Sequence, residues 1–378
     1  MKKAVREICI LLLCLFVFSG CGAKQQSSEQ GDVSELKPPA FKEDASEDVL
    51  DGMEKQNEVM STSFPDHYYY SGEKLDIDVE LDYENISFKK AVIELAEYDF
   101  VELADSLIPA DEAEMIGDNT HYIEASKKDD ASCGYSYSKT YFGYSTYAYY
   151  KIGKSVRMSE ADDAYGYYNL TKYSDKRDFS FGSEKECEDA VRKLLKKTGV
   201  STENLVPNVY YLDHKIMAEE ERYYSDNDEF VYENRFEWTE DDDTYLFFFH
   251  QKYCGLDVLP SYRQSGVDAD EQACPVIAAY GKSGLVFLKI EMPVIKSGNG
   301  CYELKDFEDV AETLKKRYEY PIDDCTYSIS KAKLICDTDD NYNARPVWSF
   351  VLKESFKDGR VSAYTVKVDA VTGDMWYR

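Results

Sequence analysis

Strict alternation of apolar and polar residues marks several short stretches of this chain as half-buried β-strands. In the clearest stretch, residues 74–83, positions 75, 77, 79 and 81 are aliphatic and positions 76, 78 and 80 are acidic. Similar alternation recurs through residues 63–182, although residues 88–108 fit a strand or a helix equally well. We therefore predict a β-rich domain over residues 63–182.

Two stretches of the C-terminal half follow the 3.6-residue period of an amphipathic helix instead. Residues 183–216 align with residues 304–335, and in each stretch the helical pattern is followed by a short loop and a strand pattern. Ser183 and Glu186 have the spacing of a capping box, and Gly199 suits the end of the first helix. The expected apolar stripe of the second helix is Phe307, Val310, Ala311, Leu314 and Tyr318. We interpret the two stretches as an internal repeat.

Strand patterns joined by turn signals follow both predicted helices. Hairpin turns are expected at residues 282–284 and at Asp358-Gly359. A helix followed twice by antiparallel strands predicts an α+β fold, with tandem units of one helix packed on an antiparallel sheet, preceded by a β-rich, tyrosine-rich domain. The expected divisions are a signal peptide at 1–20, a disordered tether at 21–62, the β-rich domain at 63–182, and the two units at 183–298 and 299–378.

The N-terminal segment has the parts of an export signal. Basic residues precede the apolar run 8–18, which is too short to cross a bilayer, and the small residues 19 and 20 then lead to Cys21. This arrangement resembles the lipobox of bacterial lipoproteins, in which the cysteine thiol receives a diacylglycerol group and becomes the mature N-terminus. Phe18 stands where most lipoboxes have Leu. The alternative is a plain secretory signal with an incidental cysteine.

The lipobox resemblance implies a location. A lipid on Cys21 would anchor the protein to the membrane, on the extracytoplasmic face of a Gram-positive-type cell. Residues 22–62 are rich in Gln, Ser, Glu, Lys and Asp, which is the composition of a tether. The globular part would then stand clear of the anchored lipid.

The charge balance excludes one class of partner. The chain has 44 Lys and Arg residues against 73 Asp and Glu residues, for a net charge of -29. Proteins that bind the phosphate backbone need a basic surface, so we expect no nucleic-acid partner.

The 33 tyrosines suggest either packing or ligand stacking. Tyr135 and Tyr137, and again Tyr147 and Tyr149, alternate with small residues, so we expect both pairs on strands with one aromatic face. Aromatic packing between neighbouring strands is the simpler interpretation. The alternative is a surface on which a sugar or a peptide stacks.

No catalytic motif is present. The four histidines have no H-E-x-x-H spacing, and the chain contains neither a G-x-S-x-G elbow nor a glycine-rich phosphate loop. Beyond Cys21, the mature chain would contain seven cysteines, an odd number that leaves at least one unpaired, and none of them forms a C-x-x-C pair. We expect no cofactor and no enzymatic activity.

One acidic stretch has partial metal-ligand spacing. Asp337, Asp339 and Asn341 occupy positions 1, 3 and 5 of an EF-hand loop. Position 6 is Tyr342 instead of Gly, and position 12 is Trp348 instead of Glu, so the stretch is not an EF-hand. Solvated turns are the simpler interpretation of such residues, and weak calcium binding is the alternative.

The C-terminal residues resemble the PepSY-type domain of secreted and membrane-anchored bacterial proteins. The resemblance lies in residues 346–348 and in the pattern V-D-A-x-T-G, whose turn residues are Asp369, Ala370, Thr372 and Gly373. Gly373 suits a left-handed turn position, and Asp369 and Thr372 can hydrogen-bond the turn backbone. These residues are typical of a turn and not of a catalytic site.

The first unit is similar to the PepSY-like YycH and YycI accessory proteins. The similar stretch is residues 245–260, with Gln251, Tyr253, Gly255, Leu256 and Val258. Those proteins act outside the membrane by binding a sensor kinase, and other PepSY proteins are thought to restrain peptidases. The resemblance therefore implies a binding or regulatory role. We predict a non-enzymatic lipoprotein that binds a protein or peptide partner; the alternative is a lipoprotein that binds carbohydrate or cell-wall peptide through its tyrosine-rich region.

Overall fold

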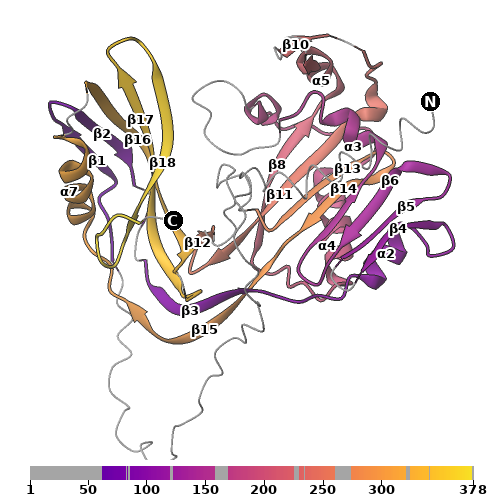
Figure 1. Cartoon of the computed structure of the whole chain (residues 1–378), viewed down its shortest axis with the longest axis horizontal. Coiled ribbons are helices and arrows are strands. Elements are labelled where there is room, and N and C mark those ends of the chain that lie inside the picture. Colours follow the sequence, from indigo (N-terminus) through magenta and orange to yellow (C-terminus); the bar gives the residue numbers. More distant parts are fainter. Residues whose placement is uncertain are drawn as a thin grey trace, which may run out of the picture.

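One hydrogen-bonded sheet of 14 strands runs through most of the computed structural model (Figure 1). The structure describes residues 62–81, 83, 86–119, 122–157, 169–224, 230–233, 235–259, 274–320, 324–339 and 341–376. The strand order is β1-β2-β16-β12-β11-β13-β14-β7-β6-β5-β4, with β17 and β18 attached through β16, and β8 attached to β11. The sheet has two halves, named here the α7 half and the α4 half after the helix that packs on each.

The α7 half combines strands from both ends of the described chain. Its elements are β1 (His67–Ser71), β2 (Leu75–Glu80), α7 (Phe307–Tyr318), β16 (Cys325–Thr338), β17 (Ala344–Phe356) and β18 (Val361–Asp369). Strands β16, β17 and β18 are antiparallel, and β1 is antiparallel to β2. The join between the two sets is parallel, with Leu75 of β2 beside Tyr327 of β16.

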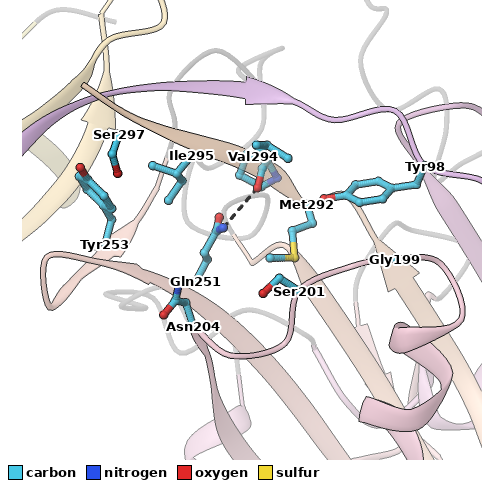
Figure 2. A pocket seen from close by; sticks show the side chains of 11 residues that line it. Tyr98, Gly199, Ser201, Asn204, Gln251, Tyr253, Met292, Val294, Ile295 and Ser297 are labelled. Carbon is cyan, nitrogen blue, oxygen red and sulfur yellow. Dashed lines mark hydrogen bonds between the residues drawn. The ribbon is translucent and has the colours of Figure 1, made fainter. Parts of the chain in front are cut away.

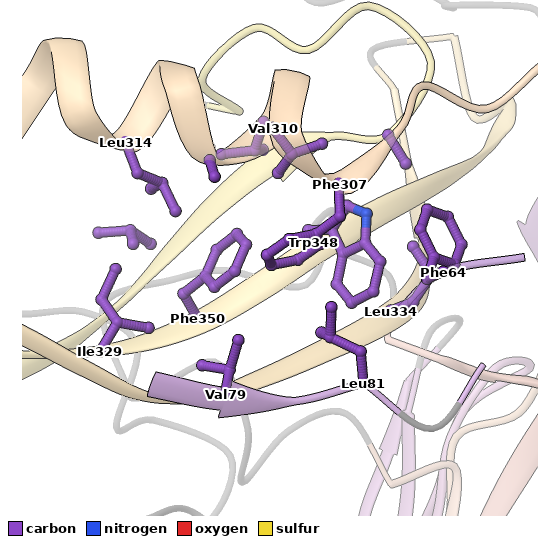
Figure 3. Close-up of a cluster of buried hydrophobic side chains, with 14 of the residues drawn as sticks. Phe64, Val79, Leu81, Phe307, Val310, Leu314, Ile329, Leu334, Trp348 and Phe350 are labelled. Atoms are coloured by element: carbon purple, nitrogen blue, oxygen red, sulfur yellow. The ribbon is translucent and has the colours of Figure 1, made fainter. Parts of the chain in front are cut away.

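The core of the α7 half lies between α7 and β17 (Figure 3). The helix buries the stripe that its 3.6-residue period predicts. Trp348 of β17 is fully buried, and its ring lies 4.9 Å from the ring of Phe307 and 5.1 Å from that of Phe64. At the end of α7, the Glu319 carboxylate accepts hydrogen bonds from two backbone N–H groups of the β1–β2 turn, at 2.6 and 3.1 Å. The first hairpin is therefore held to the helix as well as to the sheet.

The α4 half is an antiparallel sheet. Its strands are β4 (Ala113–Asn119), β5 (Tyr122–Lys127), β6 (Asp130–Tyr137), β7 (Phe142–Ser145), β8 (Leu205–Leu212), β11 (Thr244–Tyr253), β13 (Val276–Gly281) and β14 (Gly284–Ile290). They follow the order β8-β11-β13-β14-β7-β6-β5-β4, and every pair is antiparallel.

Helices cover both faces of this sheet. On one face lie α2 (Val101–Leu107) and α4 (Glu184–Lys196), and on the other lie α3 (Tyr147–Ile152), η1 (Leu170–Tyr173) and α5 (His214–Glu220). Strand β11 is apolar on both sides because it is buried between these two layers. No helix among the described residues is both long and apolar enough to cross a bilayer.

Two connections join the halves. The antiparallel ribbon of β3 (Phe88–Leu95) and β15 (Pro293–Tyr302) passes from one half to the other (Figure 1). The short strand β12 (Leu256–Val258) is antiparallel to β11 and parallel to β16, so it continues the hydrogen bonding across the junction. The remaining elements are the small hairpin of β9 (Arg222–Tyr224) with β10 (Phe230–Tyr232), and η2 (Glu240–Asp242).

The two helices predicted from the repeat are confirmed. Ser183 and Glu186 form the expected capping box at the start of α4, and Gly199 has φ +76° after its end. The hairpin turns at 282–284 and 358–359 are also present, with Gly284 and Gly359 at positive φ. These predictions depend on local pattern alone, which explains their success.

The predicted fold class is wrong. In tandem units of one helix on an antiparallel sheet, the strands of each unit would pair only with one another. The described chain instead forms one mixed sheet of 14 strands with five α-helices. In the expected β-rich domain, β1 pairs with β2, β2 also pairs with β16, and β3 pairs with β15. The next four strands complete the sheet of α4. The chain therefore buries its strands by long-range pairing, which includes parallel joins that the turn signals do not reveal.

The second tyrosine pair is not on a strand as predicted. Strand β7 ends at Ser145, and Tyr147 and Tyr149 lie in helix α3. Thr146 is the N-cap of this helix, and its backbone N–H donates to Val286 O at 3.1 Å. The run of alternating tyrosines is too short for its periodicity to separate the two structures.

Candidate binding site

A pocket of about 330 Å³ lies where the β3–β15 ribbon leaves the α4 half (Figure 2). Four parts of the chain line it: the end of β11, the start of β15, the loop between α4 and β8, and Tyr98 ahead of α2. The lining residues are Tyr98, Gly199, Ser201, Asn204, Gln251, Tyr253, Met292, Pro293, Val294, Ile295 and Ser297. The volume is at the lower end of the range for small-ligand pockets, about 300–1,000 Å³.

The alternation of β11 places a glutamine in an aromatic stripe. Side chains two residues apart on a strand share a face, so Tyr245, Phe247 and Phe249 lie under α4 and Gln251 follows them on the same side. Helix α4 ends at Lys196, and the loop that follows it lines the pocket together with Gln251. Gln251 thus extends past the helix-covered core into the pocket.

Gln251 brings an unpaired buried acceptor to the pocket. The side chain is only 6% exposed, and its Nε2 donates to the backbone carbonyl of Pro293 at 3.2 Å. A carbonyl can only accept, so the nitrogen of the amide must face Pro293 and the oxygen must face away. Oε1 has no hydrogen-bond partner among the described residues. An unpaired buried acceptor costs about 1–3 kcal/mol, which a ligand that donates an N–H or O–H would recover.

The register of the ribbon leaves an open edge of β15 beside the pocket. Ile295 of β15 is opposite Ile93 of β3, and the Ile93 N–H donates to Tyr342 O at 2.8 Å, away from β15. Residues directly opposite in an antiparallel pair either exchange both hydrogen bonds or point both sets outward. The N–H and C=O of Ile295 therefore point to the outer edge of β15.

The backbone groups of two more β15 residues point to the same outer edge, and residues of this kind are called outward-facing in parity. Pro293 and Ser297 are each two residues from Ile295, and the carbonyl of Pro293 is the one that Gln251 binds. Proline at position 293 agrees with this parity, since a residue facing outward gives no N–H to the ladder. Among the described residues, nothing pairs with the backbone groups of Ile295 or Ser297.

The pocket is electrically neutral. None of its lining residues is a carboxylate, Lys, Arg, His or Cys, although the chain has 73 acidic residues. Burial raises the pKa of the Tyr98 phenol, and it raises that of Tyr253 against a smaller lowering effect of the Ser297 hydroxyl. Both phenols are therefore uncharged at neutral pH. The arrangement can accept and donate hydrogen bonds, and its serine hydroxyls have no histidine, carboxylate or lysine beside them in the lining to act as a base.

The four tyrosines that form the alternative ligand-stacking surface do not share a surface in the structure. Tyr135 is buried under α2 and α4, and Tyr137 packs against the same core. Tyr149 lies on the other face of the sheet, stacked on Phe287 with ring centroids 3.9 Å apart. Tyr147 is 48% exposed. Packing, the simpler interpretation, accounts for three of the four side chains.

The residues with partial calcium-ligand spacing form contacts within the protein in place of a shared metal site. Asp337 is fully buried, and its Oδ2 accepts from Trp376 Nε1 at 3.0 Å and pairs with Lys367 Nζ at 3.2 Å. Asp339 accepts the backbone N–H of Asn341 at 2.9 Å within the turn. The carboxylates of Asp337 and Asp339 thus bind different parts of the protein.

The V-D-A-x-T-G residues form a turn. Asp369 Oδ1 accepts from two backbone N–H groups of the turn, at 2.7 and 3.0 Å, and its Oδ2 pairs with Arg345 at 2.6 Å. The Thr372 hydroxyl accepts a backbone N–H at 3.2 Å, and Gly373 has φ +75°. Ala370 is buried in the core of the α7 half. All four residues have structural roles.

Asp213, His214 and Asp243 form a cluster that has no motif in the sequence. Their potential ligand atoms lie within 4.8 Å of one another. Asp213 caps α5 and pairs with Arg177 at 2.7 Å. Asp243 accepts the backbone N–H of His214 and pairs with its Nδ1, both at 2.8 Å. The groups satisfy one another, so the cluster stabilises the start of α5.

The predicted lipid acceptor Cys21 lies outside the described residues. The seven other cysteines of the predicted mature chain are free thiols, five of them buried. Buried, unpaired thiols behave as small apolar side chains.

In the sequence, Gln251 and Tyr253 stand out only as part of the resemblance to the Yyc accessory proteins. The available signal was the Gln itself, which interrupts aromatic residues at every second position from 245 to 253. The open edge of β15 had no comparable signal, because it depends on register with a strand about 200 residues away.

The comparisons with known proteins show a shared fold. The solved structure of an uncharacterised protein from Eubacterium rectale is similar, with a TM-score of 0.54 and 17% identity over 83% of this chain and 94% of that chain. At that identity the likeness concerns the fold alone. No family model and no curated protein matches the chain. The resemblances to lipoproteins, PepSY domains and the Yyc accessory proteins therefore stay predictions.

Proposed function

We propose that this protein is a non-enzymatic, lipid-anchored module that binds a protein or peptide partner outside the cell, at the pocket beside β15. One observation favours this function over others: an open strand edge and an unpaired buried acceptor, Gln251 Oε1, border the same neutral pocket. Backbone edges and fixed amide acceptors are the groups that recognise a polypeptide main chain. The lining also has no histidine, carboxylate, lysine or cysteine that could serve as a general base or an activated nucleophile, which favours binding over catalysis.

The partner can be tested by site-specific cross-linking on cells. A photo-reactive amino acid at Asn204, on the exposed rim of the pocket, is expected to give a polypeptide adduct that mass spectrometry can identify. The control is the same amino acid at Tyr320, which is 83% exposed and does not line the pocket. Adducts at both positions, or at neither, would contradict the proposed function.

The proposed anchor makes a separate prediction. Replacing Cys21 with Ser removes the only atom that would accept the lipid, so the protein is expected to leave the membrane fraction for the medium, because a single lipid anchor is the whole attachment. Immunoblots of fractionated cells measure this. The Cys14→Ser variant, within the apolar run, is the matched control and is expected to stay in the membrane fraction. A Cys21→Ser protein that also stays there would contradict lipid anchoring.

The alternative ligand, a carbohydrate stacked on the tyrosine-rich region, has less support. Its expected surface is divided between the two faces of the α4 sheet. Only Tyr147 of the four side chains is well exposed.

A further inference from the structure

We propose that the partner binds as an extended, uncharged peptide segment that adds a strand to the outer edge of β15 and donates a hydrogen bond to Gln251 Oε1. This inference rests on the proposed function and specifies its binding mode. The juxtaposition is visible in Figure 2, where β15 with Ile295 and Ser297 passes over the pocket and Gln251 points up toward it from β11.

The backbone of β15 supplies the pairing groups. The N–H and C=O of Ile295 and Ser297 face the outer edge, on the same side as the Pro293 carbonyl that Gln251 binds. These two outward-facing residues can form up to four main-chain hydrogen bonds with an added strand. Main-chain hydrogen bonds give strand addition its affinity without depending on the side chains of the added peptide. A third residue of this parity, Pro293, has no N–H and is already capped by Gln251, so pairing ends there.

Gln251 limits and orients the added strand. Its amide is fixed by the bond from Nε2 to Pro293 O, and it is more than nine-tenths buried. Oε1 is therefore a rigid acceptor at the end of the open edge. A peptide N–H is a donor of the required type, whereas a carboxylate or a carbonyl would be repelled.

The lining selects against charged side chains. A side chain that enters the pocket contacts Tyr98, Met292 and Val294, with no ionic partner within the lining. Burial of an unpaired charge costs far more than burial of a neutral group. The favoured segment is therefore internal to its chain and has neutral side chains, since a free terminus is charged.

Two other edge strands of the described chain, β4 and β18, are less suited to strand addition. Strand β4 has a bulge between Met115 and Gly117, and such bulges hinder pairing at an edge. The C-terminal end of β18 is already paired, because the N–H of Trp376 donates to Lys367 O and the N–H of Asp369 donates to Asp374 O. Neither strand lines the pocket.

A binding assay with defined peptides tests the proposal. The probes are heptapeptides with blocked ends and with Ala, Ser, Val or Gln at the three central positions, titrated against the full chain in mild detergent. At least one is expected to bind, and its affinity should fall about tenfold on N-methylation of the central residues, since one hydrogen bond of this kind is worth about 1.5 kcal/mol. Asp or Lys at the central position should weaken binding at least as much. Failure of every probe, or indifference to N-methylation and charge, would overturn the binding mode.

Proline variants of β15 distinguish an effect on peptide binding at the outer edge from an effect on folding. In Ile295→Pro the lost N–H points outward, so pairing with β3 is retained and peptide affinity should fall about tenfold or more. Lys296 is opposite Val92 and has the inward parity, so Lys296→Pro should instead lower the melting temperature. Ile295→Val retains the N–H and should bind as the parent does. If Ile295→Pro folds and binds equally well, strand addition is excluded.

Gln251→Leu provides a second, independent test. It removes the acceptor at similar volume and should weaken the best peptide about tenfold while thermal stability changes little, because the unpaired Oε1 is lost together with one hydrogen bond. If Ser297→Pro, Ile295→Pro and Gln251→Leu all bind normally while the Asn204 cross-link still gives a polypeptide adduct, the proposed function stands and this binding mode fails. If the adduct is absent, the function itself fails.

Discussion

Replacing Trp348 with Ala lowers the free energy of unfolding by about 3–5 kcal/mol, the range for truncation of a large buried aromatic. The indole is fully buried and lies edge-on to the rings of Phe64, Tyr83 and Phe307. It therefore connects the first described residues, α7 and β17 in one cluster (Figure 3). Urea denaturation followed by circular dichroism measures the loss.

The Trp348→Phe variant is the matched control. The indole N–H has no hydrogen-bond partner among the described residues, so phenylalanine removes an unpaired buried donor as well as some packing. Because recovery of that desolvation cost offsets part of the cavity cost, the loss should be less than half of that for alanine. Equal losses for the two variants would contradict this account, because phenylalanine keeps a ring in the cluster and alanine does not.

The same experiment tests how the two halves are coupled. Both belong to one hydrogen-bonded sheet that is joined at β12, and the separate β3–β15 ribbon also connects them. We expect the Trp348→Ala protein to unfold in a single transition that coincides for all probes. An early transition confined to part of the ellipticity would instead show that the α7 half unfolds by itself.

Local elements could be predicted from this sequence, but their assembly could not. The capping residues and apolar stripes of α4 and α7 lie within one helix each, and the Asp-Gly hairpin signal lies between adjacent strands. The pairing of β2 with β16 joins residues about 250 positions apart, and its parallel sense has no turn signal. The two helix-and-strand repeats therefore predict units whose strands pair only within each unit. No local signal indicates that β1 and β2 extend the sheet of the second unit.

The candidate site shows the same division. Gln251 stands out in the sequence once β11 is recognised as a strand between two apolar layers. The open edge of β15 requires knowing which residues of β3 bond to Tyr342, and that parity is set by tertiary contacts. A shift of one residue would turn Ile295 inward and close the edge.

Replacing Glu221 with Gln lowers the free energy of unfolding by about 2–4 kcal/mol at pH 7. The carboxylate is fully buried and accepts hydrogen bonds from Trp238 Nε1 at 2.7 Å, from the backbone N–H of Arg235 at 2.9 Å and from the Tyr223 hydroxyl. Several donors thus converge on one charge, and hydrogen bonds to a charged acceptor are worth about 1.5–3 kcal/mol. The glutamine keeps one oxygen but turns an NH₂ group toward these donors.

The pH dependence of this loss identifies the charge as its cause. Burial alone would raise the pKa of Glu221, but the hydrogen bonds from Tyr223, Trp238 and the backbone outweigh it, so the pKa is lowered. A carboxyl group with a lowered folded-state pKa stabilises the protein above its unfolded pKa, about 4.3, and loses that contribution as the pH falls through the folded value. The parent protein should therefore approach the Gln variant in stability below about pH 4.

Glu233 provides the matched control, because it is an exposed glutamate next to the same loop. Its carboxylate pairs with Arg235 at 2.6 Å, with both side chains about half exposed. Surface pairs of this kind contribute about 0–1 kcal/mol, so Glu233→Gln should change stability little at any pH. If Glu221→Gln behaved like Glu233→Gln, the buried carboxylate would not be what joins α5 to residues 235–238. A larger, pH-dependent loss at Glu221 alone would show that this charge holds the two segments together.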